Sequence, residues 1–222
     1  MYIMLSTQPD LAYAVGKLSH FSSNPSPEHI CAVNCTFSYL QDISDSALIY
    51  QQNPDDLPKP VFRYTNADWA GETNTGRSTT GYVFFLSGAA FLWASKKQEV
   101  TAGSTMEAKY ITLYHGRHQA AWINYFLEQI SFLLNNPLEM KCNNEAAITV
   151  ANGELLHKQV KHMNVKFHTI QDYINQNLVK VTKVASEDNL TNQFTKVLPC
   201  QCFMDRTGLL GFRTHILFLL TL

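Results

Sequence analysis

Four side chains with oxygen atoms suited to a hard cation stand where expected strands end or expected helices run. They are the carboxylates of Asp68 and Glu107 and the carboxamides of Asn143 and Asn192. A pair of divalent ions about 4 Å apart needs several such oxygens around one point, with carboxylates to neutralise the charge. An amide oxygen can coordinate a cation but brings no charge. The four residues therefore predict a metal site with half of its expected charge missing.

The elements expected around these residues form a mixed sheet with helices packed on it. Strands are expected at Val61 to Trp69, Gly81 to Ser87, Ala89 to Ala94, Leu138 to Cys142 and Leu178 to Val184. Helices are expected at Gly103 to Gln129, Asn144 to Ala151, Val160 to Asn175 and Asp188 to Lys196. This order predicts an α/β fold in which the first, fourth and fifth strands lie side by side, so that their ends converge.

The first 60 residues have a different character from the sheet region. Apolar spacing from Leu11 to Phe21 predicts one helix, and Ser26-Pro27 opens a second helix that runs to about Gln41. The run from Asn53 to Pro60 contains three prolines, which break regular structure. We expect a helical connection segment over residues 1–60, a sheet domain over residues 61–200, and a C-terminal helix with an apolar tail over residues 201–222.

Composition restricts the possible partners. Seventeen Lys and Arg against 18 Asp and Glu give a net charge of −1, so nucleic-acid binding would need a local patch. The candidate patches, which could equally be solvated faces, are Lys96 with Lys97, and Lys158 with Lys161 and Lys166. Five cysteines without paired spacings disfavour a disulfide framework or a zinc site. No signal peptide or membrane-length apolar run is evident, which favours an intracellular protein, cytoplasmic or nuclear and not secreted.

Long runs of residues match the motifs of one family. The runs are YTNADWAG (64–71), RSTTGYVF (77–84), STMEAKY (104–110), CNNEAA (142–147), KHMNVKFH (161–168) and EDNLTNQFTK (187–196). They resemble the DADWAG, RSTTGYVF, SSTEAEY, CDNQSA, KHIDIRYH and EDQLADIFTK motifs in the C-terminal ribonuclease H region of copia-type retrotransposon Pol polyproteins. Residues 8–15 and 21–25 are similar to the segment that links polymerase to nuclease in that family. The resemblance covers about residues 6–212.

The resemblance implies a ribonuclease H-like fold and an activity. The family cleaves the RNA strand of an RNA–DNA hybrid with two Mg²⁺ ions held by four carboxylates. Carried over residue by residue, Asp68 and Glu107 are the metal ligands, and Asn143 and Asn192 are degenerate catalytic positions where the family has aspartates. Lys109 replaces the second Glu of the SSTEAEY motif. Loss of two carboxylates from the site predicts impaired Mg²⁺ binding and a degenerate nuclease.

Three functions stay open at this point. The chain could be an inactive retrotransposon-derived domain, a residually active metal-dependent hybrid ribonuclease, or a non-catalytic module that binds nucleic acid or the polymerase portion of a Pol polyprotein. Without the resemblance, Asp68 could be a turn residue, and Glu107 a solvent-facing acid in the first turn of a helix, where acids are favoured. The polymerase palm is absent from the sequence, so reverse transcription is not assigned to this chain.

Overall fold

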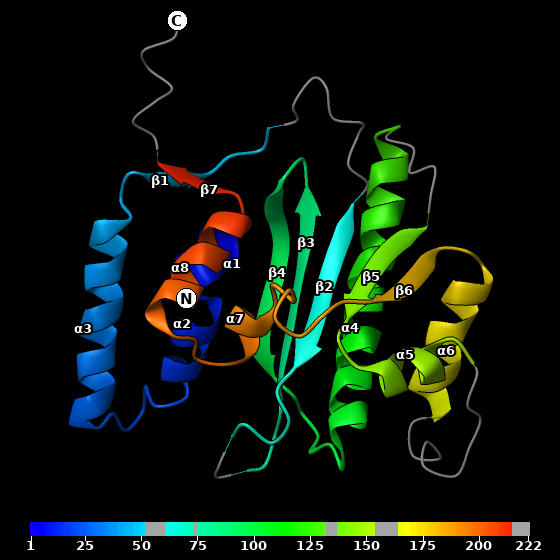
Figure 1. Cartoon of the computed structure of the whole chain (residues 1–222). Helices are drawn as coiled ribbons and strands as arrows, with labels where there is room; N and C mark the ends of the chain where they lie inside the picture. The colour runs from blue at the N-terminus through cyan, green and yellow to red at the C-terminus, as the bar shows by residue number, and fades with distance from the viewer. Residues whose placement is uncertain (52–60, 73–74, 132–136, 154–163, 215–222) are drawn as a thin grey trace, which may run out of the picture.

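A five-stranded mixed sheet forms the centre of the computed structural model, which describes residues 1–51, 61–72, 75–131, 137–153 and 164–214 (Figure 1). Its strands are β2 (Phe62–Ala67), β3 (Thr79–Leu86), β4 (Ala89–Lys97), β5 (Leu138–Cys142) and β6 (Val179–Lys183). Their order is β4-β3-β2-β5-β6. β3 is antiparallel to β2 and β4, whereas β2, β5 and β6 are parallel to one another. The predicted α/β sheet, with its first, fourth and fifth strands side by side, is confirmed.

Helices cover both faces of this sheet, as Figure 1 shows. One face carries α4 (Thr105–Gln129), α5 (Glu145–Ala151) and α6 (Asn164–Asn175). The other face carries α2 (Ala12–Ser19), α7 (Asn192–Thr195) and α8 (Cys200–Leu209). Each face has its own apolar core, because alternate residues of a strand point to opposite sides. In the part of the chain that the structure describes, no helix is both long and apolar enough to cross a bilayer.

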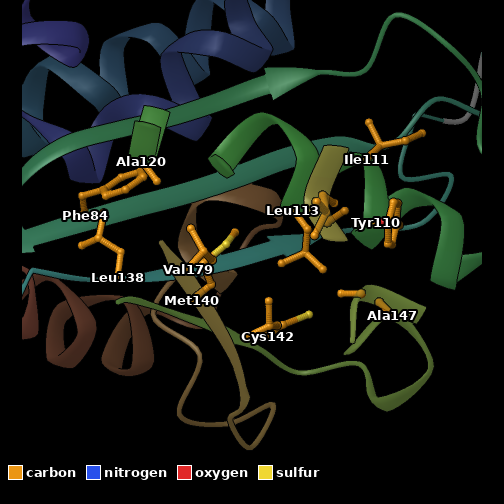
Figure 2. Packing of buried hydrophobic residues seen from close by; sticks show 14 of the residues in the cluster. Phe84, Tyr110, Ile111, Leu113, Ala120, Leu138, Met140, Cys142, Ala147 and Val179 are labelled. Carbon is orange, nitrogen blue, oxygen red and sulfur yellow. The ribbon is translucent and has the colours of Figure 1, made fainter. Parts of the chain in front are cut away.

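The larger core lies between α4 and the sheet. Apolar residues recur along α4 at helical spacing, which places one continuous stripe of the helix against the strands. Figure 2 shows side chains of this core that come from β3, α4, β5, α5 and β6: Phe84, Tyr110, Ile111, Leu113, Ala120, Leu138, Met140, Cys142, Ala147 and Val179. Gly116 does not interrupt the helix, and a Cβ there would lie 3.2 Å from Cγ2 of Thr65. The missing side chain therefore lets α4 approach β2 closely.

On the opposite face, α7 approaches the sheet over Gly81 of β3. A Cβ at Gly81 would lie 2.6 Å from Cγ2 of Thr195 and 3.0 Å from Cβ of Phe194. The helix predicted from Asp188 to Lys196 is shorter in the structure, where α7 begins only at Asn192. The buried side chain of Asn189 accepts a hydrogen bond from the backbone N of Thr191 (3.1 Å), and such local bonds compete with helix formation.

The N-terminal segment folds as helices that pack beside the sheet. It contains α1 (Tyr2–Ser6), the 3₁₀ turn η1 (Pro9–Leu11), α2 and α3 (Pro27–Asp42), followed by β1 (Ser46–Leu48). β1 pairs antiparallel with β7 (Phe212–Thr214), so the segment that follows α3 meets the C-terminal end of the described chain. Two predicted features lie outside the described residues: the boundary at 53–60 and the apolar tail from 216 onward. The predicted helix from Val160 is described only from Asn164 onward.

Candidate functional site

The carboxyl ends of β2, β5 and β6 meet at one edge of the sheet, because these three strands are parallel. Asn66 lies near the end of β2, Asn143 follows β5 directly, and Ser186 follows β6. Lys109, in α4, and Asn192, the first residue of α7, join them. This edge is the place where open α/β sheets bind their ligands.

Hydrogen bonds connect these five residues, which we call the amide cluster. Nδ2 of Asn66 donates to Oδ1 of Asn192 (2.9 Å), and Nδ2 of Asn192 donates to the backbone oxygen of Ser186 (2.6 Å). Nδ2 of Asn143 donates to Oγ of Ser186 (3.2 Å). Nζ of Lys109 donates to Oδ1 of Asn143 (2.6 Å). The structure thus brings Asn143 and Asn192, two of the four predicted site residues, to the same serine.

Strand alternation explains why Asn66 faces this cluster. Thr65 points toward α4, where its methyl group lies against Gly116. Asn66 therefore points to the other face, toward Asn192 on α7, and both side chains are buried. Asn189 fixes the approach to α7 because its Nδ2 donates to the backbone oxygen of Thr65 (3.0 Å). The position of Asn192 is consequently set by the sheet itself.

Asp68 has a different set of contacts. Its Oδ1 accepts a hydrogen bond from the backbone N of Thr79, at the start of β3. Its Oδ2 lies so close to Gly71 that a Cβ there would be 1.8 Å away. Burial raises the pKa of this carboxyl, against the lowering effect of the Thr79 bond and of Lys17. In the described part of the chain, no hydrogen bond or ion pair joins Asp68 to the amide cluster, and its contacts fasten the loop after β2.

Glu107 takes part in the start of α4. Ser104 caps the helix by accepting a hydrogen bond from the backbone N of Glu107 (3.1 Å), and Oε2 of Glu107 accepts one from the backbone N of Gly103 (2.8 Å). Lys109 lies two residues farther on, which is about 200° around the helix axis. Lys109 rather than Glu107 therefore makes the contact with Asn143. The assignment of Asp68 and Glu107 as metal ligands stays a prediction.

The polar groups of the amide cluster are not suitable ligands for a pair of Mg²⁺ ions. Mg²⁺ is held by anionic oxygens, whereas the cluster offers neutral amide and hydroxyl oxygens beside an ammonium group. Within the residues that can be described, no group of three or more His, Cys, Asp or Glu side chains could hold a metal ion. The cluster is neutral or positive where a two-metal site would be strongly negative.

The electrostatic surroundings of Lys109 reinforce this difference. Burial is the largest cause that lowers the pKa of Lys109, while nearby Cys142 raises it and positively charged Lys196 lowers it further.

The predicted patch of Lys96 and Lys97 is ion-paired, to Glu99 (3.7 Å) and Glu72 (3.3 Å) respectively. The side chains of Lys158, Lys161 and Lys166 lie outside the described residues.

The sequence prediction did not include Asn66, Lys109 and Ser186 among the site residues. For two of them periodicity limits the choice but does not decide it. Asn66 lies on the strand face of Phe62 and Tyr64, and only one of two residues at i and i+2 on a helix can face a given neighbour. Ser186 lies in the loop after β6 and carries no such signal.

Comparisons with known proteins find relatives that match nearly the whole chain. No family model matches the chain. The chain is 33% identical over 216 residues to the "Retrovirus-related Pol polyprotein from transposon TNT 1-94" of Nicotiana tabacum. The matched region makes up 97% of this chain and 16% of that protein. The chain is 28% identical over 205 residues to the corresponding Pol polyprotein from transposon RE2 of Arabidopsis thaliana, covering 92% of this chain and 14% of that protein.

Among solved structures, the chain is similar to LC11-RNase H1, isolated from compost, with a TM-score of 0.48 and 16% sequence identity. That likeness covers 61% of this chain and 92% of the other. The chain spans only 16% and 14% of the two Pol polyproteins, although both match it along nearly its whole length. The homologues of this chain are therefore copia-type retrotransposon Pol polyproteins, and the chain corresponds to a part of them.

Proposed function

We propose that this chain is a retrotransposon-derived ribonuclease H-like domain whose centre no longer supports two-metal hydrolysis. The observation that carries the proposal is the amide cluster, in which Asn66, Asn143 and Asn192 are bonded into one network with Lys109 and Ser186. This network contains three carboxamides and an ammonium group and no carboxylate. The domain keeps the scaffold of a nuclease without the charge that the chemistry needs.

The magnitude of the electrostatic effect supports this proposal. Two like unit charges about 4 Å apart repel by about 4 kcal/mol at an effective dielectric constant of 20. A divalent ion near Lys109 would meet that repulsion for each of its charges, and the neutral amides would not offset it. Mg²⁺ binding by the native cluster is therefore unfavourable.

We further propose that the amide cluster, and not a set that includes Asp68 and Glu107, is the centre inherited from the family. Asn66 contacts Asn192 directly, whereas Asp68 is bonded to the backbone N at the start of β3 and Glu107 to the backbone N just before α4. In this assignment all four positions have lost their acid. The family's motifs carry one at each of them, including the second Glu of SSTEAEY at Lys109.

A cleavage assay on a labelled RNA–DNA hybrid, with Mg²⁺ or Mn²⁺, tests both proposals. The native chain is compared with Asn143→Asp/Asn192→Asp and with the fourfold variant that adds Asn66→Asp and Lys109→Glu. We expect cleavage only by the fourfold variant. Cleavage by the double variant would show that Asp68 and Glu107 complete the site, and cleavage by the native chain would overturn the loss of function.

An RNA–DNA hybrid and the polymerase portion of a Pol polyprotein are the partners that we propose. Both belong to the cytoplasm or nucleus, where we place the domain. Binding to a hybrid without cleavage is a second candidate function. It is favoured by Lys109, a half-buried cation that is bonded to Asn143 of the amide cluster.

A further inference from the structure

Lys109 holds a positive charge at the amide cluster without a counter-ion. An ammonium group has three N–H donors, and the described contacts of Lys109 use one of them, toward Asn143. Among the described residues no carboxylate lies within ion-pair distance of Lys109. By contrast, Lys17, Lys97 and Lys183 each pair with a glutamate. The charge of Lys109 is thus available to a ligand.

Other groups at the same edge suit an anion as well. The hydroxyl of Ser186 accepts a hydrogen bond from Asn143, so its own proton is free to point toward a ligand. Lys196 is exposed, lies near enough for its charge to act on Lys109, and has no described acidic partner. Two neighbouring cations without a counter-ion repel each other, and an anion between them would relieve that repulsion.

We propose that the amide cluster binds a phosphate group of a nucleic-acid backbone directly, without a divalent metal. Lys109 and Ser186 donate hydrogen bonds to the non-bridging oxygens, and Lys196 adds attraction from the surface. The inference rests on the proposed function, because a metal-binding centre would not need a cation of its own. The group that the site recognises is phosphate, which either a nucleic acid or free inorganic phosphate can supply.

Binding to a fluorescent RNA–DNA hybrid in EDTA, followed by anisotropy over a range of salt concentrations, tests the inference. We expect Lys109→Gln to weaken binding about tenfold, as for loss of a charged hydrogen bond. We also expect the slope of log K against log salt to fall by about one. Lys109→Arg should keep most of the affinity. The matched control is Lys180→Gln, which removes an exposed charge on β6 and should leave affinity unchanged.

Inorganic phosphate distinguishes the two sources of the ligand. If it raises the melting temperature of the native chain but not of Lys109→Gln, the site takes the free anion too. If it raises neither while Lys109 still determines hybrid binding, the site is specific for the diester. Both results support the phosphate site, and the melts also show whether Lys109→Gln is folded.

The outcomes that overturn the inference differ from those that overturn the proposed function. Native affinity and an unchanged salt slope for Lys109→Gln, with no cleavage by the native chain, would refute the phosphate site alone. Hybrid binding that appears only when Mg²⁺ is added would refute it too. Cleavage of the hybrid by the native chain in Mg²⁺ would refute the proposed function.

Discussion

Nζ of Lys109 lies 2.6 Å from Oδ1 of Asn143, and this bond joins the first turns of α4 to the loop that follows β5. The amide oxygen that could coordinate a cation therefore already has a donor. The neighbouring amides are paired in the same way, through Ser186 and Asn66. Apart from Oδ1 of Asn66, which has no described partner, the amide oxygens of the cluster already accept hydrogen bonds without an ion.

Metal binding can be separated from catalysis by thermal melting. We expect Mg²⁺ or Mn²⁺ to leave the melting temperature of the native chain unchanged, because the amide cluster attracts no cation. The Asn66→Asp/Lys109→Glu/Asn143→Asp/Asn192→Asp variant should gain stability with Mn²⁺, by about 2.7 kcal/mol at a hundredfold excess over Kd. A metal-dependent shift of the native chain would contradict this expectation.

The role of Glu107 can be tested through stability. Glu107→Ala removes the acceptor for the Gly103 N–H and a first-turn acid, so we expect a loss of about 1 kcal/mol in the free energy of unfolding. Ser104→Ala should cost a similar amount, and urea denaturation measures both. The control is Glu128→Ala, an exposed acid in the last turn of the same helix, which should not be destabilising. Unchanged stability in Glu107→Ala would leave a metal-binding role as the better explanation for this residue.

Arg63 is a buried charge that we expect to reduce stability. Its side chain is fully buried, its guanidinium lies over the ring of Phe84 at 5.3 Å, and its three nitrogens have no hydrogen-bond partner among the described residues. Burial lowers its pKa well below the usual value. Replacing it by Met should raise the free energy of unfolding by about 1 to 4 kcal/mol.

Arg63→Lys is the control for that change, because it keeps an unpaired buried charge and should give no gain. Denaturant titrations of the three proteins provide the comparison. A large loss of stability in Arg63→Met would mean that the guanidinium has a partner and that its charge is stabilising.

Gly81 sets how closely α7 approaches β3. The Cβ of Gly81→Ala would meet Thr195 and Phe194 at 2.6 and 3.0 Å, and overpacking of this kind costs about 1 to 3 kcal/mol. Gly208→Ala is the matched control, because nothing lies within 4 Å of its Cβ, and alanine favours the α8 helix by up to about 1 kcal/mol. Melting temperatures should therefore move in opposite directions, and equal shifts would argue against the close approach.

Asp10 should make stability depend on pH. Its carboxyl is 2% exposed and accepts a hydrogen bond from the hydroxyl of Tyr39 (2.5 Å), and burial raises its pKa above 3.8. The folded state therefore binds this proton more tightly than the unfolded state does. As a consequence, this group stabilises the fold as pH falls toward 3.8 and destabilises it at neutral pH.

Asp10→Asn removes the charge and keeps an acceptor for Tyr39. We expect it to be more stable than the native chain at about pH 7, with a difference that shrinks toward about pH 4. Urea denaturation at several pH values measures that difference. A difference that is constant or grows as pH falls would show that Asp10 is not the group responsible.

Much of the fold was predictable because it depends on local patterns. The bounds of β5 agree with those expected, and α5 differs by one residue, since apolar periodicity and the Asn144 cap define them locally. The pairing of β1 with β7 was not predictable, because no local signal links segments so far apart in the chain. The shortened α7 follows from Asn189, whose side chain bonds locally to Thr191 and, in a tertiary contact, to Thr65.

The site was predictable in part for a related reason. Asn143 and Asn192 follow from motif and position, and the structure brings both to Ser186. Asn66 and Lys109 each stand two residues from the acid that the prediction selected. Only the register of β2 and the rotation of α4 decide which member of each pair faces the cluster, and both are properties of the packed structure.

The pairing of β1 with β7 also determines how the fold responds to a pull. Ser46 lies opposite Thr214, and Leu48 lies opposite Phe212. In this antiparallel register, the chain that leads into β1 and the chain that leaves β7 emerge at the same end of the ladder. A force applied to both would therefore separate the pairs one after another, like a zipper, before any load reached the central sheet. An unfolding machine that draws on the C-terminal end would first detach β7 and then α8, and with them Leu210 and Phe212 of the apolar core that α2 and α7 cover.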